Sequence, residues 1–166
     1  MDIRDEGPQD HEIIGQITTA AFAPMAYSSG TEAAIITTLR QTGALTLSLV
    51  AVEEGTVIGH VAFSPVTIGG ADVGWYGLGP VSVRPDRQGR GIGSALIRAG
   101  LARLRQIGAG GCVLVGNPAY YRRFGFGPLP GLRFSSAPAE NFMALRLTDA
   151  DAPQGEVAFH PGFGVH

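Results

Sequence analysis

The stretch "DRQGRGIGSA", residues 86–95, constrains the fold most, because closely spaced glycines lead directly into a helical pattern. Glycines allow the backbone to approach a ligand closely. The N–H groups at the start of a helix, together with the positive end of the helix dipole, attract anions. The stretch therefore predicts a phosphate-binding loop, with Arg87 and Arg90 supplying charge at its edges. Its glycines are Gly89, Gly91 and Gly93.

Two common phosphate-binding loops do not fit this stretch. A P-loop needs Lys and then Ser or Thr after its last glycine, whereas Gly93 is followed by Ser94 and Ala95. A Rossmann fingerprint needs G-x-G-x-x-G and an acidic residue about 20 positions later. The chain has G-x-G-x-G, and only "GGCVLVG" surrounds residue 113. The structural alternative is a glycine-rich turn that only changes the direction of the chain.

Two amphipathic helices are predicted within the first 43 residues. The first follows "GPQD". The second begins at "SGTE", which has the S-x-x-E form of a capping box, so that Ser29 and Glu32 would cap a helix that ends before Gly43. The residues expected to face inward are Ile13, Ile17, Ala20 and Ala21 in the first helix, and Ile35, Ile36 and Leu39 in the second.

The rest of the chain predicts strands around one long helix. "LTLSLVAVEE" and "VIGHVAFSPVTI" form a hairpin, and "WYGLGPVSVRP" is a further strand with an irregular point at Pro80. The periodic run from Leu96 to Ile107 predicts a helix that Gly108 ends. "CVLVG" and "FMALRL" are strands, and "PAYYRRF" is a short helix. The order predicts one mixed α/β domain over residues 1–150, with residues 151–166 an unassigned tail.

Composition excludes some function classes. The 166 residues carry a net charge of −2, which argues against charge-driven binding of nucleic acid. No apolar run is long enough to cross a membrane, and no signal peptide is expected. Cys112 is the only cysteine, so no internal disulfide forms and a cytoplasmic location is expected. Because Cys112 lies in the apolar run "CVLV", it is expected in the core rather than as a nucleophile. No metal site is expected.

The longer stretch "VSVRPDRQGRGIGSALI" resembles the acetyl-CoA-binding motif of the GNAT superfamily of N-acetyltransferases, with the core pattern Q/R-x-x-G-x-G/A. Gln88, Arg90, Gly91 and Gly93 meet that pattern. "TEAAIITTLRQTG", "SLVAVEEGTVIGHVAFSPV", "GLGPVSV" and "PAYYRRFGF" are similar to parts of the YhbS-like branch, in the same order, from about Ile3 to Leu147. The resemblance implies a mixed, mostly antiparallel sheet with a splay at the central strand, flanked by helices.

The resemblance also implies roles for residues. Acetyl-CoA is the expected donor. Its pantetheine arm would lie along Val81, Ser82 and Val83, where a backbone N–H polarises the thioester carbonyl. Tyr121 would protonate the leaving thiolate, whereas Tyr120 is expected to pack. Asn117 would contact the cofactor near its sulfur, or cap the helix that follows, or both. The pyrophosphate would be bound by Gln88, Gly89, Arg90, Gly91, Ile92, Gly93 and Ser94.

The general base and the acceptor stay open. Glu32, His60 and Ser64 are candidates near the acceptor, each with a structural alternative, and none is assigned as the base. The expected acceptor is a small-molecule or peptide amine, attacked directly in a ternary complex. A homodimer is expected by analogy alone. The alternatives are a GNAT-fold sensor that binds CoA without turnover and an acyltransferase that uses a larger acyl-CoA.

Overall fold

The computed structural model describes residues 1–25 and 30–164, which divide into two units. The first unit comprises Met1–Phe63, Gly79–Leu101 and Pro161–His166, and the second comprises Ser64–Leu78 and Ala102–His160. Three elements run through both units: β3 (Thr56–Ile68), β4 (Ala71–Val83) and α3 (Ile92–Gln106). The single domain predicted for residues 1–150, with a separate tail, stays a prediction.

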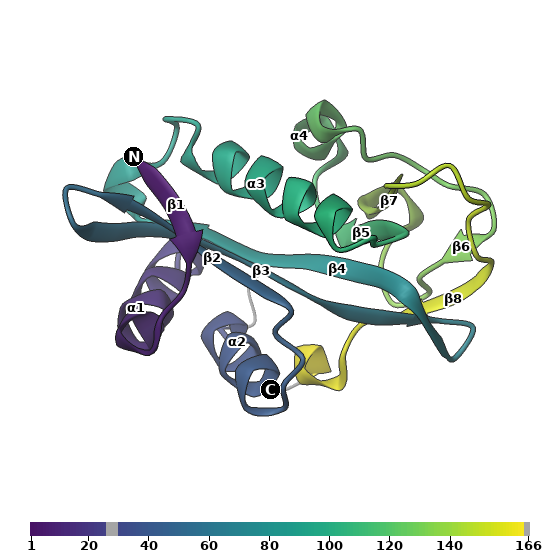
Figure 1. Cartoon of the computed structure of the whole chain (residues 1–166), viewed down its shortest axis with the longest axis horizontal. Helices are drawn as coiled ribbons and strands as arrows, with labels where there is room; N and C mark the ends of the chain where they lie inside the picture. Colours follow the sequence, from purple (N-terminus) through teal and green to yellow (C-terminus); the bar gives the residue numbers. More distant parts are fainter. Residues whose placement is uncertain (26–29, 165–166) are drawn as a thin grey trace. The chain divides into compact units, whose positions relative to one another are not determined.

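The first unit contains the predicted hairpin of β2 (Leu47–Glu53) with β3, in which Val50 lies opposite His60. An additional edge strand, β1 (Asp2–Asp5), pairs antiparallel with β2 and was not predicted, because four mostly exposed residues carry little hydrophobic pattern. Helices α1 (His11–Phe22) and α2 (Glu32–Gln41) lie side by side on one face of these strands (Figure 1). One apolar cluster joins the two helices to the strands: Ile14, Ile17, Ile36, Val50 and Val57.

Two details of the predicted N-terminal helices are wrong. Glu32 is the first residue of α2 with Thr31 as its N-cap, and no side-chain cap bond is present there. Glu32 is therefore not the last residue of a capping box, and Ser29 lies outside the described residues. In α1, Ala20 is exposed, contrary to the prediction. Ile17 and Ala21 are buried as predicted, the half-buried Ile13 packs against the core cluster, and Ile14 is buried as well.

Close backbone contact holds α3 against β3 in the first unit. A Cβ on Gly59 would lie 3.0 Å from Leu96 Cδ1 and 3.2 Å from Ile92 Cγ2. A Cβ on Gly100 would overlap the buried ring of Phe63. The predicted long helix is confirmed, except that Ile107 follows its last residue and is exposed.

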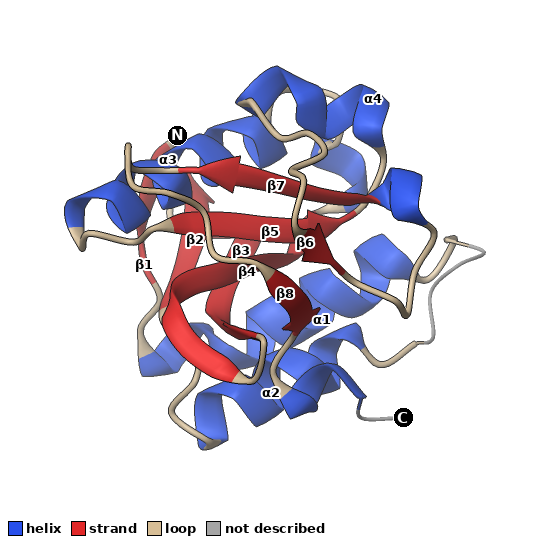
Figure 2. Ribbon diagram, turned by 90° about the vertical axis from the view of Figure 1, so that its right-hand side faces the viewer, coloured by secondary structure: helices blue, strands red, loops and turns tan. Residues whose placement is uncertain are grey.

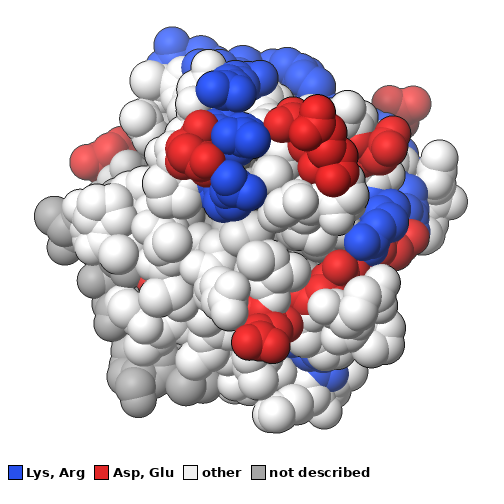
Figure 3. All heavy atoms as spheres, turned by 90° about the vertical axis from the view of Figure 1, so that its left-hand side faces the viewer, with Lys and Arg blue, Asp and Glu red and all other residues white. Residues whose placement is uncertain are grey.

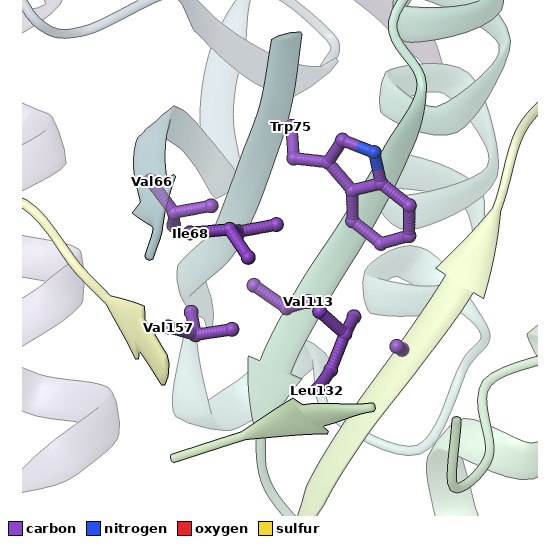
Figure 4. Close-up of a cluster of buried hydrophobic side chains, with 7 residues drawn as sticks. Val66, Ile68, Trp75, Val113, Leu132 and Val157 are labelled. Carbon is purple, nitrogen blue, oxygen red and sulfur yellow. The ribbon is translucent and has the colours of Figure 1, made fainter. Parts of the chain in front are cut away.

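The second unit is built around β5 (Gly111–Val115), which pairs parallel with β4 through Trp75–Gly111, Tyr76–Cys112 and Gly77–Val113. Antiparallel β7 (Phe142–Arg146) lies along its other side (Figure 2). Short strands β6 (Leu132–Arg133) and β8 (Gly155–Ala158) pair with each other, and β8 also pairs with β3. The tail left unassigned from the sequence thus contains a strand. Apolar side chains from these strands meet in the cluster of Figure 4: Val66, Ile68, Trp75, Val113, Leu132, Ala144 and Val157.

The hydrogen-bonded strand order is β1-β2-β3-β4-β5-β7, with β6 and β8 off this path. β4 continues through Pro80, where an irregular point was predicted and where the preceding peptide bond is cis. The predicted mixed α/β class with a mostly antiparallel sheet is confirmed. The remaining short elements are α4 (Pro118–Tyr121), η1 (Pro8–Asp10), η2 (Pro85–Arg87), η3 (Arg122–Phe124), η4 (Ala139–Asn141) and η5 (Pro161–Gly164).

The contact between Phe63 and α3 predicts that Gly100→Ala destabilises the protein, because the ring of Phe63 is buried and must move. We expect the free energy of unfolding, measured by urea denaturation, to fall by about 1–3 kcal/mol, the usual cost of overpacking. Gly15→Ala in α1 is the matched control, since nothing described lies within 4 Å of a Cβ there. That change should stabilise by about 0.5–1 kcal/mol. Equal effects of both changes would contradict the close contact.

Candidate functional site

The glycine loop joins β4 to α3 in the first unit. Gly89 and Gly91 have φ angles of 79° and 80°, which L side chains rarely adopt. Within the described residues, nothing lies within 4 Å of a Cβ built on either glycine. Gly93 differs, since it lies in the first turn of α3 together with Ser94. The backbone of the loop is therefore open to close approach at two of its three glycines.

The N-terminus of α3 adds polarity to this loop. The Ala95 N–H donates to the carbonyl of Gly91 (3.0 Å), which closes the first turn of the helix. The first N–H groups of an α-helix have no partner within that helix and carry the positive end of its dipole. With 15 residues, α3 is long enough for its dipole to be felt at the loop. The predicted anion-binding character of residues 88–94 thus has a structural basis.

Acidic neighbours partly neutralise the arginines beside the loop. Arg87 pairs with Glu53 (3.2 Å) and Asp86 (3.1 Å), and Arg84 pairs with Asp86 (2.6 Å). Asp86 consequently has a pKa below its usual range, chiefly through the hydrogen bond from Arg84. Arg87 is therefore not the free edge charge that the sequence predicted. Figure 3 shows one face on which acidic and basic side chains lie interspersed. The chain has 12 arginines and no lysine.

The Val81–Val83 segment forms the end of β4. Ser82 is buried, and its Oγ lies 3.2 Å from Thr18 Oγ1 on α1. Thr18 donates its own hydrogen to the Ile14 carbonyl (2.7 Å), so Ser82 must donate to Thr18. The Ser82 side chain is thus used inside the protein. Any contact that Ser82 makes with a ligand would therefore come from its backbone.

Asn117 and Tyr121 lie in the second unit, at either end of α4. The Asn117 Oδ1 accepts a hydrogen bond from the Ala119 N–H (2.9 Å), which confirms Asn117 as an N-cap. Tyr121 is half-buried, with ring centroids 5.0 Å from Tyr120 and 6.2 Å from Phe126. A tyrosine can pack its ring against apolar neighbours while its hydroxyl makes polar interactions, because only the ring needs an apolar surface.

Two residues that the sequence did not single out support Tyr121. A Cβ on Gly116 would lie 2.5 Å from Tyr121 Cε2, so the absence of a side chain at residue 116 leaves room for the ring. Asn141 fixes Gly116 by accepting from its N–H (2.8 Å) and donating from Nδ2 to its carbonyl (3.0 Å). No pattern of neighbouring residues predicts the contact between Gly116 and Tyr121, because it forms only when η4 folds back next to the end of β5.

The other candidate side chains are buried or occupy a helix start. His60, Ser64 and Cys112 are each 0% exposed, and Glu32 is half-buried at the start of α2. Burial raises the pKa of the Cys112 thiol well above its usual range, which opposes formation of a thiolate. The prediction that Cys112 packs in the core is confirmed.

Among residues 1–25 and 30–164, no group of three His, Cys, Asp or Glu is placed to hold a metal ion. None of the helices described is both long and apolar enough to cross a membrane.

Comparison with known proteins identifies relatives of this chain. Residues 11–126 match the model of the family described as Acetyltransferase (GNAT) family. The protein named Uncharacterized N-acetyltransferase YhbS, from Escherichia coli K12, is 44% identical over 127 residues, which cover 76% of this chain and 73% of that protein.

Two solved structures are similar over nearly the whole chain. A GNAT family acetyltransferase from Brucella melitensis, in complex with acetyl-CoA, is 56% identical with a TM-score of 0.88, covering 98% of this chain and 97% of that one. The Escherichia coli YhbS structure, in complex with CoA, is 35% identical with a TM-score of 0.86, covering 99% and 92%. The fold and branch expected from the sequence are therefore confirmed.

The burial of Cys112 predicts that its thiol is inert in the folded protein. Iodoacetamide should modify Cys112 only after unfolding, because the side chain is 0% exposed and its thiolate is disfavoured. Mass spectrometry of the intact protein, with and without denaturant, measures this directly. Alkylation of the folded protein as fast as of the unfolded chain would contradict the structure.

Proposed function

Because the chain belongs to the GNAT acetyltransferase family, we propose that it transfers an acetyl group from acetyl-CoA to an amine by direct attack in a ternary complex. The observation that carries the proposal is the loop of Gly89 and Gly91 at the N-terminus of α3. Similar chains hold acetyl-CoA and CoA in their solved structures. The open, positively polarised backbone fits a pyrophosphate.

Acetyl-CoA supplies an activated thioester when bound, and the chain supplies binding and polarisation. In this proposal residues 88–94 bind the pyrophosphate through backbone N–H groups, with Arg90 near the phosphates. The backbone of Val81, Ser82 and Val83 binds the pantetheine arm, since the Ser82 hydroxyl is already used on Thr18. One N–H of that segment would polarise the carbonyl that the amine attacks. Asn117 would hold the cofactor near its sulfur while it caps α4.

Tyr121 is the proposed proton donor for the departing sulfur. A phenol with an ordinary pKa near 10 stays protonated until a thiolate, whose conjugate acid has a pKa near 8.5, forms beside it. The ring packing against Tyr120 and Phe126, and the space left by Gly116, restrict where the hydroxyl can lie. A route through an acetylated cysteine is disfavoured, because Cys112 is fully buried.

Several finer points stay predictions. The acceptor is a small-molecule or peptide amine, and Glu32 remains a candidate for its deprotonation. A homodimer and a cytoplasmic location also stay predictions. Two alternatives share the same loop: a sensor that binds CoA without turnover, and a transferase for a larger acyl group. An amine panel assayed with acetyl-CoA and longer acyl-CoA donors separates them, since a sensor would bind cofactor and release no thiol.

The role proposed for Tyr121 predicts that Tyr121→Phe lowers kcat for CoA release at least tenfold, because general acid catalysis contributes about 10²–10⁴-fold. The KM for acetyl-CoA should change little. Tyr120→Phe is the control, since it removes a neighbouring hydroxyl and keeps the ring. Thiol release with an active amine measures both variants. Equal kcat values for Tyr121→Phe and the unchanged protein would exclude the proton-donor role.

The space beside Tyr121 gives a second prediction. Gly116→Ala should lower kcat severalfold while Tyr121 is still present, because the added methyl group displaces the ring. Gly127→Ala is the matched control, with nothing described within 4 Å of its Cβ. Combining Gly116→Ala with Tyr121→Phe should add little further loss, since both changes act on one hydroxyl. Fully multiplicative losses would show that Gly116 acts elsewhere.

A further inference from the structure

A chain of hydrogen-bonded polar groups that ends at a buried histidine in the first unit has no place in the reaction outlined so far. Glu6, after β1, accepts a hydrogen bond from Ser48 on β2, and the Ser48 Oγ lies 2.7 Å from His60 Nε2 on β3. Arg40 of α2 donates two hydrogen bonds of 2.8 Å to Glu6, and His11 of α1 lies 3.0 Å from it. The residues come from five segments of the chain, and Ser48 and His60 are buried.

The direction of each hydrogen bond follows from the charge of Glu6. Burial raises the pKa of Glu6, but the hydrogen bonds from Arg40 and Ser48 outweigh it, and the pKa lies below its usual range. Glu6 is therefore an ionised acceptor at neutral pH, and the single hydrogen of Ser48 points to it. The Ser48 oxygen can then only accept from His60 Nε2. His60 is consequently the tautomer with a proton on Nε2 and a bare lone pair on Nδ1.

The lone pair on Nδ1 is a buried acceptor without a donor. His60 is 0% exposed, and among the described residues Nδ1 has no hydrogen-bond partner. Burial lowers the pKa of His60 to about 4, so the ring stays neutral and the lone pair stays available. Buried polar atoms in proteins are nearly always paired with protein or with an ordered water molecule. We therefore expect a small hydrogen-bond donor, such as a water molecule, beside Nδ1.

His60 lies beside the strand segment that would hold the thioester. The Arg84 N–H donates to the carbonyl of Ile58 (2.8 Å), and a Cβ on Gly59 would lie 3.3 Å from the Ser82 carbonyl oxygen. These contacts place His60 on the strand next to residues 81–83. A water molecule that donates to Nδ1 would lie about 2.8 Å from it, on the face of the sheet that carries the His60 ring.

We propose that His60 is a positioning residue for the transfer reaction, whose Nδ1 holds a buried water molecule that accepts a hydrogen bond from the attacking amine. This inference rests on the proposed amine acetylation. Ser48 and Glu6 fix the tautomer, and Arg40 keeps Glu6 ionised. The water would orient the nitrogen lone pair toward the carbonyl, and His60 itself would exchange no proton.

Two variants of His60 test the roles of the two ring nitrogens separately. His60→Gln can donate an amide N–H to Ser48 but offers no acceptor at the position of Nδ1. His60→Asn offers an amide oxygen at that position but cannot reach Ser48. We expect His60→Gln to lower kcat at least tenfold with the KM for acetyl-CoA unchanged within twofold, and His60→Asn to keep kcat within threefold per folded molecule. If His60 were only structural, His60→Gln would keep full kcat, and that result would overturn the proposal.

Nitrogen NMR of the unchanged protein tests the tautomer without any variant. Between about pH 5 and 8, we expect the His60 Nε2 signal of a protonated nitrogen and the Nδ1 signal of an unprotonated one, with magnetisation transfer to Nε2–H only. A proton on Nδ1 would overturn the proposal. If the unchanged protein acetylates no amine, the proposed function is wrong. The proposed role of the water molecule is then wrong as well, even if the His60 tautomer is as expected.

Discussion

The contact between the Phe63 ring and the backbone of α3 at Gly100 is the constraint on which the glycine loop depends. A helix can approach a sheet this closely only where it carries no side chain, and Gly59 on β3 provides the matching gap. Once α3 is held there, its N-terminus has a fixed place at the end of β4. Packing in the core therefore helps to position residues 88–94, the loop that is proposed to bind the pyrophosphate.

Polar groups in the two units perform separate tasks. In the first unit, the half-buried Glu6 and the buried Ser48 and His60 form a chain whose hydrogen-bond directions follow from one ionised carboxylate. In the second unit, Asn117 and Asn141 fix the backbone around α4 and Gly116. Buried polar networks are most stable when each member is satisfied, and the Nδ1 of His60 has no hydrogen-bond partner within the described part of the chain. The acyl-transfer chemistry proposed for the chain uses this rigidity to limit how its reacting groups move.

The sequence predicted the long elements and the position of the glycine loop before α3 well, because both depend on patterns of neighbouring residues. The α3 periodicity and the glycine spacing are local, and the hairpin of β2 with β3 follows from two apolar runs on either side of the "EEGT" turn. The two-residue strand β6 and the four-residue strand β8 carry no such signal, since distant partners define them. The capping box at Glu32 was wrong because α2 begins at that residue. Contacts such as Gly116 with Tyr121 arise only from the folded arrangement.

The arginines beside the loop have a further consequence. The chain contains no lysine, so its structure presents no side-chain amine that an acetyl donor could modify. A guanidinium stays protonated at neutral pH and is a poor nucleophile. The ion pairs of Arg84 and Arg87 with Asp86 and Glu53 therefore keep their charge however long the protein is exposed to acetyl-CoA. Chemical self-modification cannot gradually alter the electrostatic environment of this loop.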